Sequence, residues 1–251
     1  LDLSYRAQLK KWKFKYLENV ETPAELPVVM SAARSQQFRW NKGAAENFQK
    51  NYSRLFFDKS LTSGTKFHGF FHLLNSSMFL LILLLAVLSV PVLYIKNSNP
   101  QFNGYFTIIA FFALSTLIFF YCYWITYKKI HGKGVKNFFE FIVMFITFFS
   151  VAMGFSVHNS MAVLEGHFGK KSEFIRTPKF NIHSLKDSWK GNKYLTKNLS
   201  FSILIESSLW LYFGFAIYSA FVLQDFGLLI FHLMLFVGFG FVVFKSLSSK
   251  V

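Results

Sequence analysis

Long apolar runs constrain the fold of this chain more than any other feature of its sequence. A helix of about 20 apolar residues is needed to cross a bilayer, whereas apolar runs in the core of a soluble domain are usually shorter. Runs of this kind occupy residues 70–95, 104–127, 199–222 and 226–244, and 53% of the 251 residues are hydrophobic. We therefore expect an integral membrane protein of mostly α class, built as a polytopic membrane helix bundle.

A fifth stretch, residues 138–164, is ambiguous. Its first half, through Phe155, is apolar enough to span a membrane, whereas its second half carries polar residues such as Ser156 and His158. If this stretch crossed the membrane, the basic loop 163–199 would lie on the outer face. Because basic loops tend to stay on the cytoplasmic side, we predict an in-plane or re-entrant helix, with the N-terminal region and the C-terminus cytoplasmic. A five-span arrangement stays open.

The net charge excludes one class of partner. A formal charge of +15, from 27 basic and 12 acidic residues, would suit a nucleic-acid-binding protein. The basic residues lie between the apolar runs, however, as a membrane topology requires, and form no separate basic domain. We therefore expect a lipid bilayer as a partner and no nucleic acid.

Few residues show the pattern of a metal site. Cys122 is the only cysteine, which excludes an internal disulfide and a cysteine cluster. His72, His158 and His232 have no second ligand at metal-binding spacing, so we interpret them as hydrogen-bonded packing residues. Glu206, near the start of an apolar run, is costly in a membrane unless it is paired or hydrated. The sequence predicts no metal site in this chain.

Candidate chemistry lies in the pentad Gln-x-x-Arg-Trp, formed by Gln36, Arg39 and Trp40. In a helix these residues stand at i, i+3 and i+4 and project from one face. A guanidinium can bind the oxygens of a diphosphate bidentately, and an indole offers an apolar plate on which a sugar ring can lie. The pentad therefore suits a sugar-nucleotide site. By itself it also fits an ordinary juxtamembrane amphipathic helix, with Arg39 among head groups and Trp40 in the aromatic belt.

The pentad lies in a segment that has the pattern of a membrane-surface helix. Residues 28–59 contain no proline and one glycine, Gly43. Apolar residues recur at helical spacing, and basic residues occupy the opposite face; the basic positions are Arg34, Lys42, Lys50 and Arg54. We predict one or two interfacial helices, with Gly43 ending or bending the first.

The first 27 residues have a different character. Residues 13–17 alternate like a short edge strand, and Pro23 and Pro27 argue against a helix that continues through them. We interpret residues 1–27 as the end of a truncated α/β domain.

Several stretches, in order, resemble one family. The residues 1–7 (LDLSYRA), 10–14 (KKWKF), 25–27 (ELP), 35–43 (SQQFRWNKG) and 174–179 (FIRTPK) are similar to segments of the processive family 2 glycosyltransferases. That family includes the cellulose synthases and the cellulose-synthase-like mannan and glucan synthases. The chain departs from the family pattern at Arg176, where valine is usual.

The resemblance implies roles for individual residues. Gln36 and Arg39 would lie near the donor diphosphate, and Trp40 would stack on the acceptor sugar. A gating loop would comprise Phe174, Arg176, Thr177 and Lys179. The catalytic base would stand just before Leu1, so that Asp2 is a structural neighbour of the base, and Mg²⁺ or Mn²⁺ would be bound further upstream. This chain would then hold neither the base nor the metal site.

The resemblance also implies an activity. It is that of an inverting membrane glycosyltransferase, which transfers sugar from a nucleotide-sugar donor of the UDP-glucose or GDP-mannose type to a growing β-linked polysaccharide and exports the product. Two alternatives stay open. One is a non-processive lipid glycosyltransferase similar to ceramide glucosyltransferases, and the other is a non-enzymatic membrane translocation or anchoring module.

The implied organisation has five parts. These are the end of a cytosolic glycosyltransferase domain (1–27), interfacial helices with the pentad (28–68), two transmembrane helices (69–127), a cytoplasmic loop with the interfacial or re-entrant helix and gating loop (128–198), and two transmembrane helices with a short tail (199–251).

Overall fold

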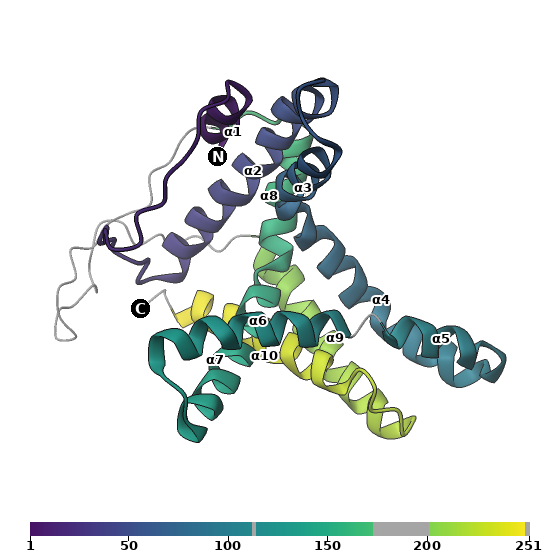
Figure 1. Ribbon diagram of the computed structural model, residues 1–251. Coiled ribbons are helices and arrows are strands. Elements are labelled where there is room, and N and C mark those ends of the chain that lie inside the picture. The colour runs from purple at the N-terminus through teal and green to yellow at the C-terminus, as the bar shows by residue number, and fades with distance from the viewer. Residues whose placement is uncertain (112–113, 173–200, 249–251) are drawn as a thin grey trace. The chain divides into compact units, whose positions relative to one another are not determined.

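The computed structural model describes residues 1–111, 114–172 and 201–248 (Figure 1). Every regular element in these ranges is helical, which confirms the mostly α class. The chain divides into two compact units, which are described separately. The first unit comprises residues 1–82, 156–203 and 244–251, and the second comprises residues 83–155 and 204–243.

One long helix, α2 (Met30–Phe57), is the centre of the first unit. It runs through Gly43 without interruption, so the prediction that this glycine ends or bends the helix was wrong. A glycine in a helix interior costs about 1 kcal/mol relative to alanine. Packing of α2 against its neighbours offsets that cost, since helices in proteins are stabilised mainly by tertiary contacts. The other elements of this unit are α1 (Asp2–Leu9), α3 (Ser63–Leu73), the short 3₁₀ helix η1 (Asn75–Ser77) and α8 (Ser156–His167).

Helix α8 packs along α2 with the same chain direction. His158 contacts Arg34, Glu165 contacts Lys42 and His167 contacts Gln49, so residue numbers increase together along both helices. The two backbones are in close contact at Gly166. A Cβ atom added there would lie 2.6 Å from the Lys42 carbonyl oxygen and 2.7 Å from Ala45 Cβ. Gly166 thus sets the separation of α2 and α8.

Helices α1 and α3 pack against the C-terminal part of α2 (Figure 1). A small core of Tyr5, Leu55 and Leu73 joins the three helices. The Tyr5 hydroxyl also hydrogen-bonds His72 Nδ1 at 2.7 Å and lies 3.3 Å from the Gly69 carbonyl oxygen. Apolar burial and a satisfied hydroxyl together fix α1 against its neighbours.

The structure of the first residues differs from the prediction of a short edge strand. Residues 12–28 have no helix, as Pro23 and Pro27 indicate, but residues 13–17 do not form the predicted strand. A strand needs a neighbour to pair with, and the described part of the chain supplies none.

The second unit is built from apolar helices. These are the larger part of α4 (Met78–Ser98), η2 (Pro100–Phe102), α5 (Asn103–Ala110), α6 (Leu114–His131), α7 (Val135–Gly154), and most of α9 (Ser202–Val222) and α10 (Leu229–Ser248). The described ranges contain five segments long and apolar enough to cross a membrane: Asn75–Ser98, Pro100–His131, Val135–Gly154, Ser202–Val222 and Leu229–Ser248. The chain is thus an integral membrane protein.

The ambiguous stretch 138–164 is two helices and not one, with Phe155 between α7 and α8. Helix α7 meets the length and composition of a membrane span, whereas the more polar α8 packs on α2 in the first unit. The choice between four and five spans stays a prediction, which labelling of a cysteine placed at Ser188 in intact cells would test.

Two polar pairs join helices within the apolar second unit. His232 Nε2 lies 2.9 Å from Ser89 Oγ, and the Tyr94 hydroxyl lies 2.8 Å from Ser219 Oγ. An unpaired polar group costs several kcal/mol in a bilayer, so these pairs tie α4 to α10 and α9. His72, His158 and His232 are each hydrogen-bonded, as expected; His232 is buried and His158 half-buried, whereas His72 is exposed.

Candidate functional site

The pentad occupies the N-terminal half of α2, as predicted, with Gln36, Arg39 and Trp40 in one continuous helix. The α8-facing side of α2 is marked by Phe38, which packs on the His158 ring at 5.5 Å, and by Ala45. At about 100° per residue, Gln36 and Trp40 project from the opposite side, with Arg39 between the two directions. Gln36 and Arg39 are half-buried, whereas Trp40 is 61% exposed. The indole plate is therefore available to a ligand.

The side of α2 that carries Trp40 continues toward its C-terminal end with Asn47 and Asn51. These residues follow Trp40 by 7 and 11 positions, which is two and three helical turns. Both are buried, and Asn51 Nδ2 donates to Asn47 Oδ1 at 2.7 Å. Asn51 Nδ2 also lies 3.2 Å from Asp2 Oδ1. The start of α1 thus contacts the same side of α2 that carries the pentad, closer to the C-terminal end of that helix.

Two hydrogen-bond donors and one further cation contact the Asp2 carboxylate. Besides Asn51, Lys50 Nζ lies 3.0 Å and Arg6 Nε lies 3.1 Å from Asp2 Oδ2. The hydrogen bonds from Lys50 and then Asn51 hold the pKa of the Asp2 carboxyl below its ordinary value of 3.8. Asp2 is therefore a carboxylate at neutral pH.

A second charged cluster lies on the side of α2 toward α8. Lys42 Nζ lies 3.2 Å from Glu165 Oε2 and donates to Ser172 Oγ at 2.8 Å, while Lys170 Nζ lies 2.6 Å from Glu165 Oε1. The sequence placed Arg34 and Lys42 on the basic face of an interfacial helix, opposite its apolar residues, but both are buried. The partners of Lys42 lie more than 120 residues away in sequence.

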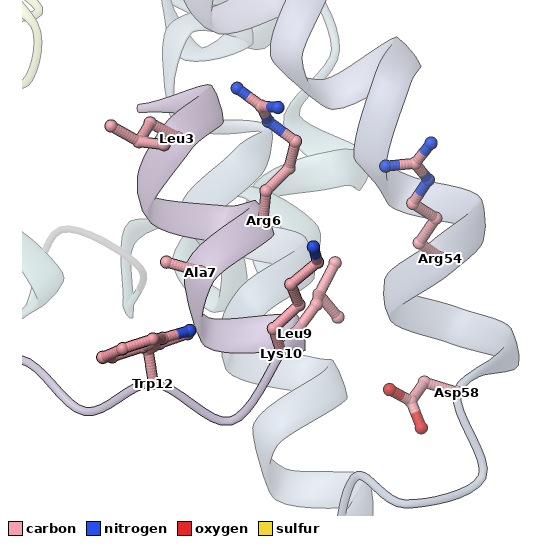
Figure 2. Close-up of a pocket in the computed structure, with 8 residues that line it drawn as sticks. All are labelled: Leu3, Arg6, Ala7, Leu9, Lys10, Trp12, Arg54 and Asp58. Atoms are coloured by element: carbon pink, nitrogen blue, oxygen red, sulfur yellow. The ribbon is translucent and has the colours of Figure 1, made fainter.

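A pocket of about 560 Å³ lies between α1 and the C-terminal end of α2 (Figure 2). Arg6, Lys10 and Arg54 line it together with Asp58 and the Trp12 indole. Arg54 follows Trp40 by 14 residues, roughly 21 Å along the helix, so this pocket is distinct from the pentad.

The predicted gating loop and catalytic base lie outside the described residues. The gating-loop residues Phe174, Arg176, Thr177 and Lys179 are outside the described residues. Within those residues, no group of three or more His, Cys, Asp or Glu side chains could hold a metal ion. The base that is expected just before Leu1 is outside the chain.

Comparison with known proteins finds glucomannan 4-beta-mannosyltransferases among the relatives of this chain. The chain is 29% identical over 205 residues to glucomannan 4-beta-mannosyltransferase 1 of Oryza sativa subsp. japonica, which covers 76% of the chain and 35% of that protein. It is 28% identical over 202 residues to glucomannan 4-beta-mannosyltransferase 9 of Arabidopsis thaliana, covering 77% and 34%. A 68-residue stretch, 27% of the chain and 12% of the relative, is 43% identical to probable glucomannan 4-beta-mannosyltransferase 3 of Oryza sativa subsp. japonica.

The chain spans about a third of the length of these relatives. No family model and no solved structure matches it. The relatives confirm the resemblance to cellulose-synthase-like enzymes that the sequence stretches indicated.

Proposed function

We propose, on the premise that this chain is the C-terminal membrane part of a cellulose-synthase-like glycosyltransferase, that it belongs to an enzyme that builds and exports a β-linked, mannan-like polysaccharide. The observation that carries the proposal is the exposed Trp40 indole beside Gln36 and Arg39 on one continuous helix. Its relatives bear the name of glucomannan mannosyltransferases, which favours a GDP-mannose type of donor over UDP-glucose.

In this proposal, Arg39 and Gln36 act on the leaving group. As the bond between the sugar and the diphosphate breaks, negative charge develops on the diphosphate oxygens. A guanidinium and an amide held on a rigid helix donate hydrogen bonds to that charge without reorganising. Mg²⁺ or Mn²⁺, bound by residues outside this chain, would supply further charge neutralisation.

Trp40 would orient the acceptor. The terminal sugar of the growing chain lies on the indole plate, which aims its hydroxyl at the anomeric carbon of the donor. A base that precedes Leu1 takes the proton of that hydroxyl. Direct displacement at the anomeric carbon inverts an α-linked donor to a β-linked product. The apolar helices of the chain would then serve the export of the product, with both termini on the cytoplasmic side.

Substitution of Trp40 in the full-length enzyme tests the acceptor role. Membranes that carry Trp40→Ala should incorporate labelled mannose from GDP-mannose into polymer on the order of 100-fold more slowly than the unchanged enzyme, because the acceptor loses its orientation. Phe57→Ala is the matched control, since Phe57 is an exposed aromatic residue at the end of the same helix. It should change the rate less than twofold.

The product separates the alternatives. Retention of polymer synthesis by Trp40→Ala would overturn the acceptor role. Label that appears only in organic-extractable lipid would instead favour the lipid glycosyltransferase, and the absence of transfer from either donor would favour a translocation or anchoring module. Faster transfer from UDP-glucose than from GDP-mannose would overturn the assigned donor.

A further inference from the structure

Helix α1 and the residues just after it are held at three points. Asp2 binds Lys50 and Asn51 of α2, Tyr5 is buried against Leu55, and Lys11 Nζ donates to Ser60 Oγ just after α2. The contacts advance together along both segments, so α1 runs in the same direction as α2. The N-terminal end of α1 therefore points along α2 toward the pentad.

The first of these contacts lies on the same side of α2 as the pentad. Asn51 follows Trp40 by 11 residues, three helical turns, which brings both side chains to one side within about 20°. The separation along the axis is roughly 16 Å. The start of α1 therefore lies on the side of α2 where Trp40 projects, and it is the end of α1 nearer to Trp40.

We propose that Lys50 and Asn51 are positioning residues of the transferase: by holding the Asp2 carboxylate, they set where the residues that precede Leu1 stand relative to the acceptor platform at Trp40. The inference rests on the proposed function, in which a base precedes Leu1. Neither residue touches substrate.

The charges at this contact favour such a role. One Asp2 oxygen accepts from the amide of Asn51, and the other accepts from Lys50 and forms an ion pair with Arg6. Arg6 belongs to α1 itself, so it orients the carboxylate but cannot tie α1 to another helix. The Asn47 side chain accepts from Asn51 and fixes the direction of its amide. Lys50 and Asn51 are therefore the side chains through which α2 holds the beginning of α1.

Such a contact matters because proton transfer and attack depend steeply on geometry. A displacement of about 1 Å can lower a rate by about 100-fold. The Tyr5 core would keep α1 folded against α2 and α3 if the Asp2 contact were lost. Loss of the contact should therefore allow the first turn of α1 to move while the helix stays docked.

The test uses the full-length enzyme in membranes with Lys50→Met, which keeps the length of the side chain and removes its charge. We expect kcat to fall at least tenfold with the KM for the nucleotide-sugar unchanged within twofold. Lys50→Arg should retain most of the activity. Asp2→Asn should resemble Lys50→Met, and the double variant should be no worse than the poorer single variant, because both remove one interaction. Lys59→Met, at an exposed lysine just after α2, is the control and should change kcat less than twofold.

A distance measurement independent of activity accompanies the kinetics. Spin labels at the exposed positions Leu3 on α1 and Glu46 on α2, with other accessible cysteines removed, should give a narrow distance distribution. Lys50→Met should broaden it, and Lys59→Met should not. An unchanged distribution in Lys50→Met would overturn the anchor whether or not the enzyme is active. A broadened distribution with unchanged kcat would overturn the positioning role. An inactive parent enzyme with a broadened distribution in Lys50→Met would leave the anchor intact and overturn the proposed function and the positioning role with it.

Discussion

Lys42 Nζ lies 3.2 Å from Glu165 Oε2, and this contact joins the helix of the pentad to α8 across 123 residues of sequence. The two partners differ in their surroundings. The Lys42 side chain is 6% exposed and has Ser172 as its other hydrogen-bond acceptor, whereas Glu165 is 22% exposed and also binds Lys170. Loss of Glu165 would therefore leave the buried Lys42 ammonium without a counter-charge, whereas loss of Lys42 would leave Glu165 paired with Lys170.

Substitution of each partner should show this asymmetry. Glu165→Leu leaves a buried ammonium without a counter-charge and should lower the free energy of unfolding by about 2–4 kcal/mol. Lys42→Met leaves Glu165 paired with Lys170 and should cost about 1 kcal/mol. Thermal unfolding in detergent measures both. Glu140→Gln, which removes an exposed i,i+4 contact of 3.8 Å with Lys136, should change stability by less than about 0.5 kcal/mol. Equal effects of Glu165→Leu and Lys42→Met would contradict the inference that Glu165 is the main counter-charge of the buried Lys42.

Gly166 and Gly43 offer a matched pair on the same two helices. A Cβ at Gly166 would press on the Lys42 carbonyl oxygen and on Ala45, whereas one at Gly43 would meet no atom within 4 Å. Gly166→Ala should therefore destabilise the protein by about 1–3 kcal/mol because α8 is pushed from α2. Gly43→Ala should stabilise it by about 0.5–1 kcal/mol through helix propensity. Thermal unfolding in detergent would again decide, and a stabilised Gly166→Ala variant would show that the helices are not in close contact there.

His158 predicts a pH dependence of stability. Its burial lowers the pKa of the imidazole from 6.5 to about 4, while its Nε2 hydrogen-bonds the Arg34 carbonyl oxygen at 2.9 Å. Between these two values the unfolded chain binds a proton that the folded protein does not, so folding weakens as the pH falls from about 6.5 to about 4. The total contribution is roughly 3 kcal/mol.

His158→Gln can keep a donor near Arg34 and removes the titration, so its stability should fall less over this pH range than that of the unchanged protein. Denaturant unfolding at pH 7, 5.5 and 4.5 would compare the two. Parallel curves would mean that His158 titrates normally in the folded protein.

The apolar runs and the pentad were predictable because both are local patterns. The runs at 199–222 and 226–244 correspond to α9 and α10 within a few residues, since the length of an apolar run largely decides a membrane helix. The helix that presents Gln36, Arg39 and Trp40 was predictable from the helical spacing of the apolar residues in its segment.

The errors arose where distant residues decide the structure. Gly43 stays helical because α2 packs against other helices, and residues 13–17 remain irregular for want of a partner strand. The burial of Lys42 depends on Glu165, and that pairing has no signature near Lys42 in the sequence. The contact between Asp2 and Lys50 was missed for the same reason, because a lysine on the polar side of an amphipathic helix is ordinarily solvated.

Within the second unit, α7 and α10 are in backbone contact at Gly154 and Gly238. A Cβ at Gly238 would overlap the Ser150 carbonyl oxygen, and one at Gly154 would overlap the Gly238 carbonyl oxygen. Small residues at such crossings let membrane helices approach closely, and lipid cannot fill the gap that opens when they are forced apart. Gly238→Ala should therefore lower the thermal unfolding midpoint in detergent by several degrees, corresponding to roughly 1–3 kcal/mol. Gly104→Ala, at a helical glycine with open space around it, should not lower the midpoint. Because a Cβ at Gly238 would meet backbone and not a flexible side chain, a Gly238→Ala midpoint as high as that of Gly104→Ala would show that α7 and α10 do not cross at this point.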